Sequence, residues 1–186
     1  LNSLTSHEAD LIKTPIREHN FWDLIDSYRT CYDLDLDHFD MVITMKYPCW
    51  MIKHRNLVCW TFHCLRGLYD TYHLMNLPEH VKRGNKFVDS ILDMMQEEPH
   101  PDSLHAFFEI LETLRENASL VPEEIFSFPG PFIRKLVHYM DSFALTTSRV
   151  RRFYSLSKTI TARKGYFPTD AQVKVVYVPP VFKDYK

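Results

Sequence analysis

Residues 39–72 read FDMVITMKYPCWMIKHRNLVCWTFHCLRGLYDTY and decide the fold. Two runs within this stretch, 39–45 and 57–62, are rich in apolar, β-branched and aromatic residues, a composition that favours buried strands. The segment 47–52 between them is short and suits one turn of helix. We therefore expect two strands of one sheet joined by a short crossover.

The residues before this stretch indicate one strand and one helix. Residues 9–13 form a short apolar run that ends at Thr14 and Pro15, so we expect a strand there. Asn20 is a good N-cap for a helix over 21–32, in which apolar side chains recur at helical spacing.

The residues after the stretch predict a helical block and then a return to alternating elements. A helix is expected over 66–75 and is stopped by Pro78, and residues 85–141 carry helical periodicity without strand signals. Beyond the block we expect, in order, a strand over 152–156, a helix over 157–164 and a strand over 173–178.

This order of elements predicts an α/β fold with a Rossmann-like, mostly parallel sheet. Strands that alternate with helices are joined by crossovers, and we expect these to cover both faces of the sheet. The block at 85–141 is then a helical insertion. Because ligands of such folds bind at the carboxyl ends of the strands, the residues that follow each strand are the candidates for chemistry.

Composition narrows the class of protein. The 186 residues are 45% hydrophobic and 25% charged, which are ordinary values for a globular chain. The net charge of −2 gives no electrostatic ground for binding nucleic acid. The four cysteines have no disulfide-framework spacing, no metal-ligand spacing is found, and no apolar run is long enough for a membrane span. We therefore expect free thiols, no metal site and a cytoplasmic protein.

Four polar side chains lie at or beyond the ends of the two central strands. Lys46 follows the first strand, His63 follows the second, and Arg66 and Asp70 lie one and two turns further on. An imidazole exchanges protons near neutral pH, and a guanidinium matches a phosphate or a carboxylate. The same residues also fit a structural role, with His63 bonded to a backbone carbonyl and Arg66 paired with Asp70. Spacing alone favours the structural role.

The central stretch resembles the N-terminal half of bacterial family 4 glycosyltransferases, which are retaining enzymes of the GT-B fold. The D-x-V-I-x-x-K-[FY]-P motif of that group is matched at 40–48, and its K/R-H-P-N-x-V-V-W-x-x-H-Q-x-R-x-x-Y-D block at 53–70. Arg55 and Cys64 replace the proline and glutamine that are usual in the block. Residues 151–180 resemble the segment that closes the N-terminal domain of the family.

The resemblance implies an enzyme that passes a sugar from a nucleotide-sugar to a glycan or lipid-linked acceptor in cell-surface polysaccharide synthesis. His63 would be the catalytic residue that faces the transferred sugar. Arg66, Lys46 and Asp70 would bind substrate, with Lys46 at the switch point of the sheet. The nucleotide-sugar donor is a co-substrate and no cofactor is implied. The acceptor would bind to this domain, with contact to the inner face of the membrane.

The resemblance also implies that residues 1–186 are a single acceptor-side domain truncated at both ends, with an interdomain linker that begins near residue 178. The first strand of the family, its glycine-rich turn and the donor domain have no counterpart here, so the chain alone would be inactive. Because that first strand is central in a doubly wound sheet, we expect residues 9–13 to join a rearranged sheet edge or a partner strand.

Six basic residues gather late in the sequence: Arg149, Arg151, Arg152, Lys158, Arg163 and Lys164. They fit a solvated face or, as the less favoured interpretation, contact with an anionic membrane surface. The alternative function is a non-catalytic α/β interaction module that uses the helical block as its partner surface. A cleft at the strand ends containing His63 and Arg66 would favour the transferase. A filled cleft with apolar surface on residues 85–141 would favour the module.

Overall fold

The computed structural model describes residues 5–96 and 103–178 and contains one four-stranded, all-parallel sheet. The predicted fold class, an α/β protein with a Rossmann-like sheet flanked by helices, is confirmed. The strands pair in the order β1-β2-β3-β4, and their bounds are Val42–Lys46 (β1), Leu57–His63 (β2), Val150–Ser155 (β3) and Val173–Val175 (β4). The linker expected from about residue 178 falls on 179–186, outside the described residues.

The helices follow the predicted order except over residues 66–75, and the last helix ends at Thr161 rather than near residue 164. Their bounds are Phe21–Asp33 (α1), Lys86–Met94 (α2), Ser103–Glu116 (α3), Pro131–Ala144 (α4) and Lys158–Thr161 (α5), with 3-10 helices at Cys49–Met51 (η1), Tyr72–Met75 (η2), Ala118–Leu120 (η3) and Glu123–Phe126 (η4). Asn20 caps α1 by accepting a hydrogen bond from the backbone N–H of Asp23, and the Ser157 side chain caps α5. The helical block expected over 85–141 is confirmed as α2, α3 and α4.

The strand expected over residues 9–13 is not formed. These residues belong to no strand and are exposed, with Leu11 78% accessible. Further on, the Ser27 hydroxyl of α1 bonds both the N–H and the C=O of Arg17. Because none of the four described strands pairs with residues 9–13, an extended conformation there forms no cross-strand side-chain pairs with them.

The helix expected over 66–75 is also wrong, because the chain forms turns there and only η2 is helical. The carbonyl oxygen of Arg66 accepts hydrogen bonds from both the N–H and the hydroxyl of Thr71. The Thr71 N–H lies five residues after the carbonyl that it bonds, so the turn is wider than that of an α-helix, in which the donor lies four residues after the acceptor. Gly67 within the segment weakens the helical alternative further.

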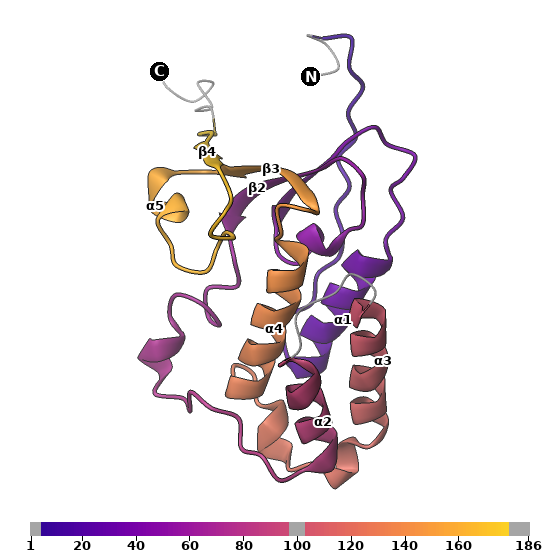
Figure 1. The fold of residues 1–186 in the computed structure, drawn as a ribbon, viewed down its shortest axis with the longest axis vertical. Coiled ribbons are helices and arrows are strands. Elements are labelled where there is room, and N and C mark those ends of the chain that lie inside the picture. Colours follow the sequence, from indigo (N-terminus) through magenta and orange to yellow (C-terminus); the bar gives the residue numbers. More distant parts are fainter. Residues whose placement is uncertain (1–4, 97–102, 179–186) are drawn as a thin grey trace.

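The helices cover only one face of the sheet, and the expectation of two covered faces is therefore wrong. In Figure 1, α1, α3 and α4 all lie on one side of β2 and β3. Helix α5 is on the same side, since the buried hydroxyl of Ser155 lies 2.6 Å from the Thr161 hydroxyl. The strand order explains this, because right-handed crossovers that always advance in one direction place every connection on the same face.

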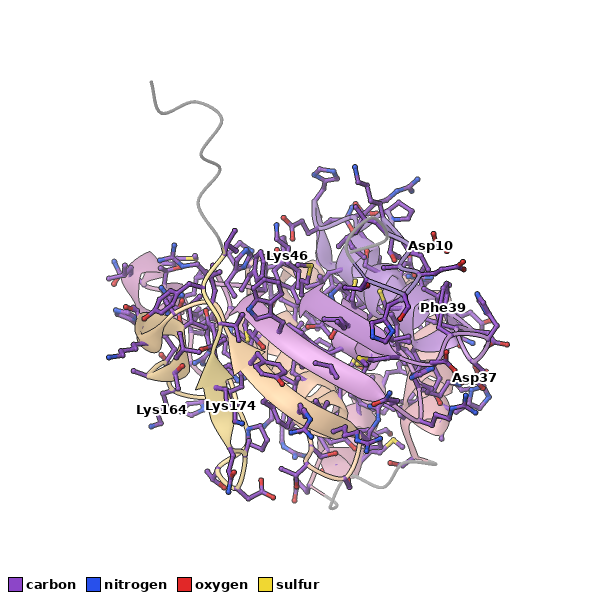
Figure 2. All side chains as sticks on the ribbon, turned by 90° about the horizontal axis from the view of Figure 1, so that it is seen from above. Asp10, Asp37, Phe39, Lys46, Lys164 and Lys174 are labelled. Atoms are coloured by element: carbon purple, nitrogen blue, oxygen red, sulfur yellow. The ribbon has the colours of Figure 1, made fainter. Side chains whose placement is uncertain are left out.

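The opposite face of the sheet is open in Figure 2, which looks onto it from above. Along β1 the side chains alternate, with Val42 and Thr44 buried and Ile43 54% accessible. Val58 pairs with Ile43, which places it on the same side of the sheet, although it is itself buried. Further along, the open face continues with half-buried or exposed side chains at alternate positions: Trp60, Phe62, Arg152, Tyr154 and Lys174. The described part of the chain thus leaves a mixed apolar and basic surface uncovered.

Candidate functional site

Lys46 and His63 lie opposite each other at the carboxyl end of the sheet. They are register partners across β1 and β2, and the ring of Tyr47 lies 5.8 Å from the His63 imidazole. Lys46 is exposed at this edge, where Figure 2 labels it, and His63 is half-buried at the rim rather than packed in the interior. The predicted position of both residues at strand ends is confirmed. No switch point lies at Lys46 among the described strands, however, because their order never reverses.

The His63 ring is oriented by the backbone. Its Nδ1 atom lies 3.0 Å from the carbonyl oxygen of Cys64, and a carbonyl only accepts hydrogen bonds. The neutral ring is therefore protonated at Nδ1, and its Nε2 atom is left as the acceptor. This arrangement suits a group that takes a proton from a ligand hydroxyl, or that donates one when charged.

Asp70 fixes the turn that follows His63. Its Oδ2 atom accepts hydrogen bonds from Arg163 at 2.5 Å and from the Tyr166 hydroxyl at 2.8 Å, and Arg66 Nε lies 3.3 Å away. The expected pair of Arg66 with Asp70 is therefore formed, although not on a helix. With its side chain only 19% accessible, Asp70 fastens this turn to the segment after α5.

Arg66 is the more available partner of that pair. Its side chain is 57% accessible, and only its Nε atom contacts Asp70. Its two terminal nitrogens have no hydrogen-bond partner in the described part of the chain. A guanidinium held at one nitrogen and open at the other two is suited to a bidentate bond with a phosphate or carboxylate.

Sequence reasoning missed a buried carboxylate beneath this edge. Asp141 of α4 is 2% accessible and accepts hydrogen bonds from Tyr28 at 2.9 Å, Trp50 at 2.7 Å and Tyr69 at 2.7 Å. Burial raises the pKa of Asp141 to about 6, although the three hydrogen bonds favour the charged form. The signal was present in the sequence, because Asp141 lies four residues after Val137, on the apolar stripe of the helix.

A cavity of about 470 Å³ lies next to Asp141. His138 stacks on the Tyr69 ring with centroids 3.9 Å apart, and its Nε2 atom donates to the carbonyl of Leu68 at 2.9 Å. The cavity is also lined by residues that precede β3 and β4, among them Thr147 and Asp170. Tyr69, in the turn after β2, lines it as well, but neither His63 nor Arg66 does.

The six basic residues noted in the sequence do not act as one group. Arg149 points inward and donates to the carbonyls of Met51 and Ile52, and burial lowers its pKa. Arg163 is bound to Asp70. Exposed Arg151 and Arg152 lie at the irregularity where β3 pairs with β2.

Among residues 5–96 and 103–178, no three His, Cys, Asp or Glu side chains lie close enough together to hold a metal ion. No helix within the same ranges is long and apolar enough to cross a membrane. No protein-family model, no curated protein and no solved structure matches the chain. A functional assignment therefore depends on the geometry and the sequence motifs.

Proposed function

We propose that the chain is the acceptor-binding domain of a glycosyltransferase that passes a sugar from a nucleotide-sugar to a glycan or lipid-linked acceptor. The observation that supports this most strongly is the pairing of Lys46 with His63 at the carboxyl ends of adjacent parallel strands. That edge is where α/β sheets bind their ligands. The motif resemblance over residues 40–70 points to the same side chains.

Each residue at this edge has a role in the proposal. His63, with Nε2 as the acceptor, binds the reacting hydroxyl or the transferred sugar and is the catalytic residue. Lys46 and Arg66 attract the negative charge of a sugar phosphate or a lipid phosphate. Asp70 acts as a positioning residue that holds Arg66 through one nitrogen and leaves its other two nitrogens for the substrate. In this proposal the nucleotide-sugar is a co-substrate, and the reaction needs no cofactor.

Acceptor binding by the purified chain tests this proposal. We expect the chain to bind some members of a panel of immobilised glycans and of vesicles that carry prenyl-phosphate-linked sugars. The variants His63→Ala and Arg66→Ala should each weaken that binding about 10-fold or more, the effect of losing one charged or bidentate contact. His38→Ala is the matched control, because His38 is exposed before β1, at the amino edge of the sheet. The absence of any binding, or equal binding by His63→Ala, would overturn the proposal.

A second candidate is the non-catalytic interaction module, which the open face of the sheet favours. Purely parallel sheets are normally buried on both faces, whereas Ile43 and Met45 are exposed here. The helical block is a poorer partner surface than expected, because its large side chains Phe107 and Phe108 are buried. Ile43→Asp separates the two functions, since it changes the open face and leaves His63 and Arg66 in place. Loss of glycan binding in this variant would count against the strand-end site.

A further inference from the structure

Two of the four thiols lie close together on different elements. Cys31 is in α1 and is fully buried, and Cys49 is the first residue of η1 and is half-buried. Their sulfur atoms are 3.9 Å apart. The remaining thiols, Cys59 and Cys64, are both buried and have no such partner thiol at hydrogen-bond distance within the described chain.

The close pair is chemically unequal. The Cys31 S–H donates to the Cys49 sulfur, which lowers the pKa of Cys49 and raises that of Cys31. Burial instead raises the pKa of Cys59 to about 11 and raises that of Cys64. Thiolates and not thiols react with oxidants, so the partly accessible Cys49 is the preferred nucleophile of the four.

We propose that Cys31 and Cys49 form a reactive dithiol site that a hydroperoxide oxidises to an intramolecular disulfide. The Cys49 thiolate attacks one peroxide oxygen, the O–O bond breaks, and hydroxide or an alkoxide leaves as Cys49 becomes a sulfenic acid. The Cys31 sulfur then attacks the sulfenic sulfur, and the S–S bond forms with the loss of water. Two thiols are thereby oxidised and one peroxide is reduced.

The sulfur atoms of Cys31 and Cys49 are close enough for this step. A disulfide has a bond length of about 2.05 Å, so the two sulfurs must approach by about 2 Å, a movement that side-chain rotation and a small shift of η1 supply. Helix η1 follows β1 directly, and Cys49 lies two residues after Tyr47, whose ring faces His63. The disulfide would therefore tie α1 to the segment that carries the carboxyl edge. The inference is independent of the proposed transferase function.

Oxidation of the folded chain by hydrogen peroxide, followed by alkylation and peptide mapping, tests the proposal. We expect a linked pair of peptides that contain Cys31 and Cys49. Cys31→Ser should stop at the Cys49 sulfenic acid, which dimedone traps, and Cys49→Ser should abolish the link. Cys59→Ser, which removes a buried thiol outside the pair, is the matched control and should form the link as the unaltered chain does.

Alkylation kinetics of the unaltered chain test the proposal even if one of the variants does not fold. We expect iodoacetamide to modify Cys49 at least about 10-fold faster than Cys59 or Cys64 under native conditions, because of its greater thiolate fraction and access. Equal rates at the three thiols, or oxidation without a link between residues 31 and 49, would overturn the proposal.

Discussion

Lys46 lies opposite His63 because the pairing of β1 with β2 shifts between Thr44 and Lys46. Thr44 pairs with Cys59, so a regular continuation would place Lys46 opposite Thr61. Because of this irregularity, Lys46 lies opposite His63, the last residue of β2. A local departure from the strand register thus sets which charged side chain accompanies the imidazole at the carboxyl edge.

Asp141 should make stability depend on pH. Its pKa is about 6 in the folded chain and about 3.9 when unfolded, so between these values the folded state binds more protons than the unfolded state. The contribution of this group is therefore fully present below pH ~4 and is lost as the pH rises to about 6, by about 3 kcal/mol in total. In Asp141→Asn the amide oxygen can still accept from Tyr28 and Trp50, so this pH dependence should disappear. Urea unfolding of both proteins from pH 4 to pH 7 checks it, and identical slopes would contradict it.

Removing the Asp141 side chain should have a much larger effect. Asp141→Ala leaves the donors of Tyr28, Trp50 and Tyr69 buried without their acceptor, and we expect a loss of about 3–5 kcal/mol in the free energy of unfolding. Ser142→Ala is the matched control at the next position, which is exposed, and should change stability by less than about 0.5 kcal/mol. Similar losses in the two variants would mean that the three hydrogen bonds to Asp141 do not stabilise the fold.

Asp70 and Arg66 should differ in their effect on stability although they form one ion pair. Asp70→Ala removes the acceptor of Arg163 and Tyr166, and we expect a loss of about 2 kcal/mol. Arg66→Ala should lose less than about 1 kcal/mol, because the Arg66 side chain is 57% accessible and solvent screens the pair. Thermal or chemical unfolding measures both. A loss for Arg66→Ala as large as that for Asp70→Ala would assign Arg66 to the structure rather than to a ligand.

Because helices cover only one face of the sheet, substitutions on its two faces should lower the free energy of unfolding by different amounts. Leu57 is 1% accessible on the covered face, and Leu57→Ala should lower the free energy of unfolding by about 3 kcal/mol. Ile43 is 54% accessible on the open face, and Ile43→Ala should lower it by less than about 1 kcal/mol. Equal losses, measured by urea unfolding, would mean that the open face is covered in solution.

Local composition was enough to predict the four strands that form, but it also predicted one that does not, and it did not predict how the sheet is covered. The run from Leu57 to Phe62 was rich enough in β-forming residues to place β2 within one residue, and with it His63 at the strand end. Whether helices cover one face or two depends on the order of the strands, which no single segment encodes. Residues 9–13 failed as a strand for a similar reason, because a strand needs a neighbour that the run itself does not specify.

The sequence predicted only part of the site, because several of its contacts join residues that are far apart in the chain. Arg66 and Asp70 stood at a spacing that predicted their pair, but Arg163 and Tyr166, which bind Asp70 more closely, come from far along the chain. Asp141 lies on the apolar stripe of α4. Its hydrogen-bond donors lie in α1, η1 and the turn after β2, and they could be assigned only from the fold.

An NMR titration of the chain with geranyl phosphate, a short soluble analogue of a lipid-phosphate acceptor, tests the carboxyl-edge site most directly. We expect saturable shifts of the His63 ring protons and of the Lys46 and Arg66 signals, with the amides of Val42 and Leu57, at the opposite ends of the same two strands, unchanged. Shifts confined to the open sheet face or to the cavity beside Asp141, with the His63 ring unaffected, would contradict the account.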